Sequence, residues 1–135
     1  MLYALFCYDR EDVVWSWTKE EDEAVMGRLA VVNQKLHKAG KLGPSARLLP
    51  TTAATTLRKD AGMVIDGPFA ETKEQLLGFY ILDCVSLDEA LDIARELAAA
   101  NPSLGAYEVR PVAFFSPGVD VAKREVAGLI ADGVA

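Results

Sequence analysis

The chain has one histidine and two cysteines among its 135 residues. Because the sequence holds neither a cysteine pair nor a second histidine at the spacing of metal ligands, we expect no zinc site and no other bound metal. Cys7 and Cys84 each lie in an apolar, strand-like stretch. We interpret them as buried free thiols of a reducing compartment, not as a disulfide.

Long apolar runs and clusters of positive charge are also missing. No apolar run approaches the roughly 20 residues that a membrane helix needs, and residues 1–8 lack the basic start and cleavage site of a signal peptide. The net charge is −6, with 14 basic residues scattered among 20 acidic ones, which disfavours binding to phosphate backbones. We therefore expect a cytoplasmic protein that binds neither membranes nor nucleic acids.

The familiar cofactor and nucleophile motifs are absent as well. We find no phosphate-binding loop, dinucleotide fingerprint, serine-nucleophile elbow or metal-binding helix motif, so no cofactor is predicted. What remains is an ordinary globular composition, with 51% hydrophobic and 25% charged residues. At this length the chain is expected to fold as one domain with its own core.

The predicted elements alternate between strands and helices. Capping boxes at Thr18 and Ser86 predict the starts of two helices, which Gly40 and Asn101 end. A third box, Thr72 with Gln75, predicts a single helical turn. Strands are expected over residues 2–8, 54–58, 63–66, 77–84 and 106–115, with a short edge strand within 42–50.

This order contains two strand–helix–strand halves and predicts an α+β ferredoxin-like sandwich. The two helices would cover one face of the sheet, and a second subunit is the simplest cover for the other face. Residues 116–135 form a tail, in which Ala122, Val126, Leu129 and Ile130 repeat at helical spacing and predict an extra C-terminal helix.

The run Val64-Ile-Asp-Gly-Pro-Phe-Ala-Glu-Thr-Lys-Glu74 resembles the signature of the DGPF proteins, a branch of the YCII-related family. The segments Gly78-Phe-Tyr-Ile-Leu-Asp83 and Glu108-Val-Arg-Pro-Val112 resemble the strands that follow it. The similarity covers residues 1–115 as one domain and leaves the tail 116–135 outside.

The resemblance implies a fold of the dimeric α+β barrel type, a homodimer with a pocket between sheet and helices in each subunit. It also implies a small-molecule enzyme or, from the frequent association of this branch with sigma factors, a regulatory module. Small YCII proteins carry a histidine early in the first helix, whereas residues 21–30 here contain none. A histidine–aspartate pair is therefore not carried over.

Asp66 and Glu71 are the candidate catalytic residues. Asp66 ends a predicted strand at a Gly-Pro turn, where a carboxylate is able to act as a general base. It is equally able to hydrogen-bond its own turn. Glu71 and Lys73 either fold over a ligand beside Asp66 or lie in a solvated turn.

The candidate ligand-binding residues are arginines, a lysine and aromatic side chains. An arginine within a strand either grips an anion or pairs with a carboxylate such as Asp66 or Glu108. Aromatic side chains either line a pocket for a planar ligand or belong to the core, and a tryptophan in a polar loop suits a lid or a dimer contact. The candidates are Arg58, Lys73, Arg110, Phe69, Tyr80 and Trp17.

Three functions follow from these residues. The first is a small-molecule enzyme that uses acid/base chemistry near the Asp66–Phe69 loop. The second is a binding or sensing module with the same pocket but no turnover. The third is a protein-interaction module that partners a sigma factor, for which an acidic surface suits a basic, DNA-binding partner.

Overall fold

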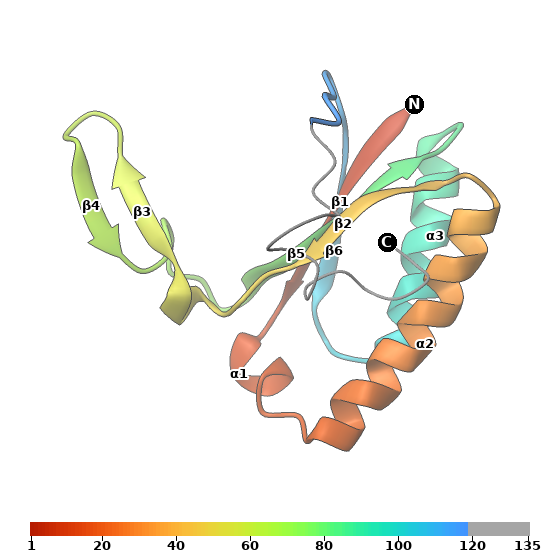
Figure 1. The fold of residues 1–135 in the computed structure, drawn as a ribbon, viewed down its shortest axis with the longest axis horizontal. Helices are drawn as coiled ribbons and strands as arrows, with labels where there is room; N and C mark the ends of the chain where they lie inside the picture. The colour runs from red at the N-terminus through yellow and green to blue at the C-terminus, as the bar shows by residue number, and fades with distance from the viewer. Residues whose placement is uncertain (119–135) are drawn as a thin grey trace.

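A computed structural model describes residues 1–118 of the chain. Its main sheet is antiparallel throughout, in the order β2-β5-β1-β6 (Figure 1). The four strands are β1 (Leu2–Asp9), β2 (Leu42–Arg47), β5 (Gln75–Asp83) and β6 (Ala106–Pro111). This order, with one long helix in each half, is the ferredoxin-like α+β fold that the sequence predicts.

Two long helices, α2 (Lys19–Lys38) and α3 (Leu87–Ala100), lie on the same face of this sheet (Figure 1). The smaller elements are a four-residue helix, a 3₁₀ turn and a hairpin, namely α1 (Glu11–Val14), η1 (Thr51–Ala53), β3 (Thr55–Arg58) and β4 (Met63–Asp66). The predicted C-terminal helix falls mainly outside the described residues.

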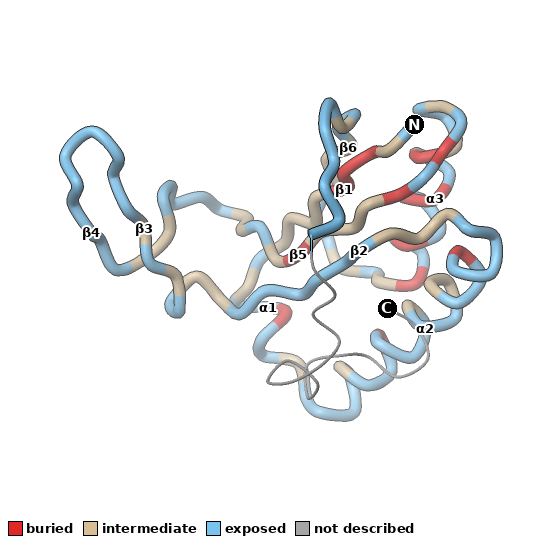
Figure 2. Tube along the Cα trace, turned by 45° about the horizontal axis from the view of Figure 1, so that its top comes forward, coloured by how far each residue is buried: buried red, intermediate tan, exposed pale blue. Residues whose placement is uncertain are grey.

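The core lies between the sheet and the two helices, where the buried positions gather in Figure 2. Side chains alternate along a strand, so Tyr3 and Leu5 of β1 and Leu82 of β5 face the helices and are at most 4% exposed. Leu36 of α2 and Leu97 of α3 pack against them.

The opposite face of the sheet is not covered by any element among residues 1–118. We call it the open face, and its apolar residues are half-buried except for Ala4, which is buried. Arg110 and Glu108 of β6 lie there too, because Arg110 pairs with Ala4 and Glu108 with Phe6 in the register of β1 and β6. The apolar members are Leu2, Ala4, Phe6, Phe79 and Ile81.

Helix α2 begins and ends where the sequence predicts. The Thr18 hydroxyl accepts from the Glu21 N–H at 3.1 Å, and the Glu21 carboxylate accepts from the Thr18 N–H, so the capping box is complete. At the other end Gly40 has a φ of 71°. The N–H groups of Gly40 and Lys41 donate to the carbonyls of His37 and Leu36, which is the Schellman arrangement.

The predicted helical turn at Thr72 is wrong. Gln75 begins β5 and pairs with Asp9, and its side-chain amide donates to the Thr72 carbonyl at 2.7 Å. The pairing of β5 with β1 therefore outweighs the local capping pattern.

The sequence predicts that the last strand reaches residue 115, but β6 ends at Pro111. The Val112 N–H still donates to the Leu2 carbonyl. Only Met1 precedes Leu2, so β1 has almost no further residues with which the last strand could pair.

Candidate functional site

Two hollows open near α1, at the end of the sheet where β2 ends and β5 begins. We call the first, of about 360 Å³, the tryptophan cleft. It is bounded by the end of α1, the first turn of α2 and the residues at and after the end of β2. Its lining residues are Val14, Trp15, Trp17, Lys19, Asp22, Arg47, Leu48 and Leu49.

Arg47 is the central polar group of the tryptophan cleft. Its guanidinium carbon lies 5.1 Å from the centre of the Trp15 ring, within the range of a cation–π contact. Its Nη2 donates to the Asp22 carboxylate at 3.1 Å. The guanidinium is therefore held between an indole face and a carboxylate, and these two contacts fix its position.

The charge of the cleft has the opposite sign to that of the chain. Lys19 and Arg47 contribute two positive charges and Asp22 one negative charge, whereas the whole chain carries a net charge of −6. Two indoles and two leucines supply apolar walls around these groups. Such a site favours a small molecule that has an anionic group and a planar apolar part.

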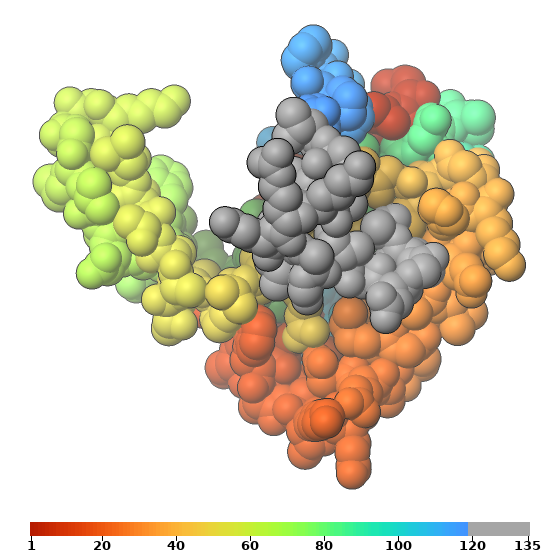
Figure 3. Space-filling model, in the orientation of Figure 1, coloured from red at the N-terminus to blue at the C-terminus, as the bar shows by residue number. Residues whose placement is uncertain are grey.

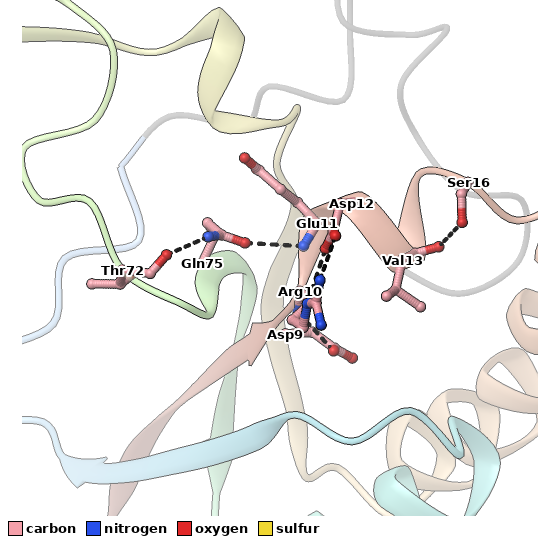
Figure 4. A network of polar contacts seen from close by, with 8 residues as sticks. All are labelled: Asp9, Arg10, Glu11, Asp12, Val13, Ser16, Thr72 and Gln75. Carbon is pink, nitrogen blue, oxygen red and sulfur yellow. Dashed lines mark hydrogen bonds and ion pairs between the residues drawn. The ribbon is translucent and has the colours of Figure 1, made fainter.

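The second hollow, of about 440 Å³, is polar and has no net charge. Its lining comprises Arg10, Glu11, Asp12, Lys73 and Gln75. The Arg10 guanidinium binds Asp12 through two nitrogens, at 3.2 and 2.6 Å (Figure 4). These bonds hold the pKa of the Asp12 carboxyl below its ordinary value. The arginine is therefore already satisfied by a neighbour.

Glu11 connects α1 to two distant segments of the chain. Its carboxylate accepts from the Thr51 N–H at 2.8 Å and from the Thr51 hydroxyl. Its own N–H donates to the Gln75 side chain at 3.0 Å (Figure 4). Thr51 and Gln75 lie just before and after the segment that contains the β3–β4 hairpin, so α1 holds both of its ends.

The predicted catalytic carboxylates lie outside both hollows. Asp66 ends β4 on the hairpin, and Glu71 follows it in an irregular segment; both are exposed. Phe69 is 76% exposed. The Arg58 guanidinium carbon lies 5.5 Å from the centre of its ring. The structure thus joins Arg58 to Phe69, but it does not bring Asp66 to either cleft.

Arg110 and Tyr80 lie on opposite faces of the main sheet. Arg110 forms an ion pair with Glu108, which is one of the two alternatives that the sequence left open, and its guanidinium carbon lies 5.6 Å from the Phe6 ring centre. Tyr80 packs against the core. Burial raises its pKa to about 12. Burial also raises the pKa of the Cys7 thiol to about 12, so the Tyr80 hydroxyl and the Cys7 thiol are both protonated near neutral pH.

Of the predicted residues, Trp17 lines the tryptophan cleft and Lys73 lines the polar hollow. Sequence reasoning did not single out Arg47 or Asp22. Nothing local marks them, because Arg47 and Asp22 are separated by 25 residues and the pair forms only when β2 packs beside α2. Among residues 1–118, no group of three histidine, cysteine or acidic side chains is placed to hold a metal ion.

Residues 1–118 also contain no helix whose length and apolar character would allow it to cross a membrane.

An uncharacterised protein of Rhizobium meliloti is 66% identical over 120 residues, which cover 87% of this chain and 97% of that protein. Comparison with solved structures gives a match to a 5-chloro-2-hydroxyhydroquinone dehydrochlorinase from Burkholderia phenoliruptrix, in complex with 2,5-dihydroxybenzoquinone. It is 18% identical, with a TM-score of 0.49 over 83% of this chain and 93% of that one.

The family comparison agrees with the resemblance seen in the signature. The sequence-family model for the YCII-related domain matches residues 1–116, which include both halves of the main sheet and the hairpin between them. The chain therefore belongs to the YCII-related domain family.

Proposed function

We propose that the protein binds a small organic anion with a planar, aromatic part in the tryptophan cleft. The observation that carries this proposal is the Trp15–Arg47–Asp22 arrangement, with a guanidinium 5.1 Å from an indole centre and 3.1 Å from a carboxylate. The ligand's ring would contact the indoles, and its carboxylate would bind Lys19 and Arg47 in partial exchange for Asp22.

Turnover is the second part of this proposal. Asp22 is the carboxylate that lines the cleft, so a reaction within one chain would use it, or a water molecule beside it, as the base. Asp66 and Glu71 remain predicted catalytic residues, but either would have to approach the ligand from outside the cleft of its own chain. Without turnover, the same cleft would serve a sensor.

The test is a titration followed by tryptophan fluorescence, with benzoate and salicylate as probes and acetate as the non-aromatic control. We expect Arg47→Gln to weaken binding of the aromatic acids by about tenfold or more, since a hydrogen bond to a charged group contributes about 1.5–3 kcal/mol. Arg95→Gln is the matched control, because Arg95 is exposed on α3 and pairs with Asp92, outside the cleft.

Equal affinity of Arg47→Gln and the unaltered chain would contradict the proposed site. Binding of acetate as tightly as benzoate would contradict the aromatic part of the ligand. Incubating the bound acid and following it by NMR then separates an enzyme from a sensor. Asp22→Asn should then lose any turnover, because it removes the carboxylate that lines the cleft, whereas a loss of turnover in Asp66→Asn with unchanged affinity would assign the base to Asp66 instead.

A further inference from the structure

The contact between Arg47 and Asp22 leaves much of the hydrogen-bonding capacity of both side chains unused. Arg47 Nη2 donates to Asp22 Oδ1 at 3.1 Å, and within residues 1–118 neither side chain makes another hydrogen bond. A guanidinium has five N–H donors, and both oxygens of a carboxylate accept. The second oxygen of Asp22, Oδ2, and the Arg47 nitrogens Nε and Nη1 therefore remain available to a ligand in the tryptophan cleft, which both residues line.

The pair lies in surroundings where a charge acts strongly on its neighbours. The Arg47 and Asp22 side chains are 39% and 35% exposed, and indole and leucine side chains wall the cleft around them. Charges in such half-buried surroundings are screened less than charges on an open surface. Figure 3 shows α1 and the first turns of α2, in red and orange, together at the surface at the bottom of the view, so a ligand reaches this part of the molecule from solvent.

A ligand whose only polar group is a carboxylate meets a conflict in this cleft. When its carboxylate binds Arg47, it lies close to the Asp22 carboxylate, which carries the same charge. Lys19 offsets little of this repulsion, since its side chain is 89% exposed and its ammonium lies 3.9 Å from Glu23 Oε1. A hydrogen atom on the ligand, placed between its carboxylate and Asp22, replaces the repulsion by a hydrogen bond.

A hydroxyl group on the carbon next to the ligand carboxylate supplies this hydrogen. The bonded atoms of Arg47 and Asp22 are only 3.1 Å apart, so the acceptor and the donor of the ligand have to be close together as well. An ammonium at the same position also donates, but it makes the ligand a zwitterion without net charge. Lys19, Arg47 and Asp22 give the cleft one net positive charge, which favours a ligand with one net negative charge.

We propose that Asp22 determines the specificity of the tryptophan cleft and selects 2-hydroxy acids that carry an aromatic side chain. This inference rests on the proposed function, because it assigns a narrower class of aromatic acid to the same site. The ligand carboxylate binds the remaining N–H groups of Arg47, and the 2-hydroxyl donates to Asp22 Oδ2. The ring lies against the indoles of Trp15 and Trp17. Arg47 thus recognises the acid, and Asp22 recognises the hydroxyl beside it.

The first test compares three probes with one carbon skeleton, titrated against the unaltered chain by tryptophan fluorescence. Phenyllactate, 3-phenylpropionate and phenylalanine carry a hydroxyl, a hydrogen and an ammonium on the carbon next to the carboxylate. We expect phenyllactate to bind about tenfold or more tightly than 3-phenylpropionate, which is the effect of a hydrogen bond to a charged group. Phenylalanine should bind less tightly than phenyllactate.

The outcomes of this comparison separate the inference from the proposed function. Equal affinities for phenyllactate and 3-phenylpropionate overturn the inference and leave the cleft as a site for aromatic acids. Tightest binding of phenylalanine overturns it too, because Asp22 would then recognise an ammonium. If benzoate binds and none of the three probes does, the inference alone is wrong. If no aromatic acid binds, the proposed function is wrong and the inference falls with it.

The second test removes the carboxylate of Asp22. In Asp22→Ala the preference for phenyllactate over 3-phenylpropionate should fall to about one, while 3-phenylpropionate still binds through Arg47. Asp22→Asn should keep a smaller preference than the unaltered chain, since a hydrogen bond to a neutral acceptor is about half as strong. Glu20→Ala is the matched control and should keep the full preference, because Glu20 has the same charge in the first turn of α2 but does not line the cleft.

The ratio of the two affinities distinguishes recognition from a structural role. If Asp22 only held Arg47 in place, Asp22→Ala would weaken both acids by the same factor and keep the preference, and this result overturns the inference. Circular dichroism should show the same fold in all variants. The comparison of probes on the unaltered chain decides the question even if a variant does not fold.

Discussion

At the scale of single residues, Glu89 shows how one side chain joins several elements. The sequence predicts a capping box with Ser86, and half of it forms, since the Glu89 N–H donates to the Ser86 hydroxyl at 3.2 Å. The Glu89 carboxylate instead accepts from Lys41 at 2.7 Å and from the Val85 N–H at 3.3 Å. The Lys41 bond is the main reason why the pKa of Glu89 lies below its ordinary value of 4.5.

This lowered pKa predicts a pH-dependent stability. Ionised Glu89 stabilises the native state. Above pH 4.5, the unaltered chain should therefore have a larger free energy of unfolding than the Glu89→Gln variant. The difference should shrink as the pH falls through the lowered folded-state pKa, because the native carboxylate then gains its proton. Urea denaturation at several pH values measures this difference in the free energy of unfolding, and Asp60→Asn in the hairpin turn is the control. A difference independent of pH would contradict this account.

At the scale of elements, two glycines with opposite surroundings test how tightly the sheet is built. A Cβ at Gly78 of β5 would lie 2.5 Å from the Ala46 carbonyl oxygen of β2, whereas a Cβ at Gly27 of α2 meets nothing within 4 Å. We expect Gly78→Ala to destabilise the protein by about 1–3 kcal/mol through overpacking. Gly27→Ala should stabilise it by about 1 kcal/mol through helix propensity.

Urea denaturation measures both glycine variants on the same scale. Equal stability of Gly78→Ala and the unaltered chain would show that the edge strand β2 moves aside at no cost. The position of β2 would then be less fixed than its pairing with β5 indicates.

The elements also differ in how well the sequence alone predicts them, because some depend on local residues and others on distant contacts. Helix α2 depends on residues within one turn of each end, so Thr18 and Gly40 mark it without any knowledge of the fold. The tryptophan cleft depends on Arg47 meeting Trp15 and Asp22, which are far from it in sequence. The Thr72–Gln75 pattern failed for the same reason, because pairing of Gln75 with Asp9 outweighs a local capping preference.

At the scale of the whole molecule, α1 connects the tryptophan cleft, the β3–β4 hairpin and the body of the protein. Trp15 directly follows α1 and lines the tryptophan cleft. Glu11 begins α1 and holds both ends of the segment that carries the β3–β4 hairpin. Val14 is 7% exposed and fixes the short helix to the body of the protein. Occupation of the cleft and the placement of the β3–β4 hairpin therefore depend on the same four-residue helix.

Glu11→Ala should loosen the segment that carries the β3–β4 hairpin and leave the main sheet unchanged. The variant removes the acceptor for the Thr51 N–H and hydroxyl, so amides in residues 51–74 should exchange with deuterium faster, as measured by mass spectrometry of peptide fragments. Amides of β1 and β5 should keep their rates, since their pairing does not involve this side chain. Asp12→Ala is the matched control on the same helix, because Asp12 pairs with Arg10. If both variants loosened the segment equally, or if exchange in β1 rose too, Glu11 would support the fold in general and not the β3–β4 hairpin.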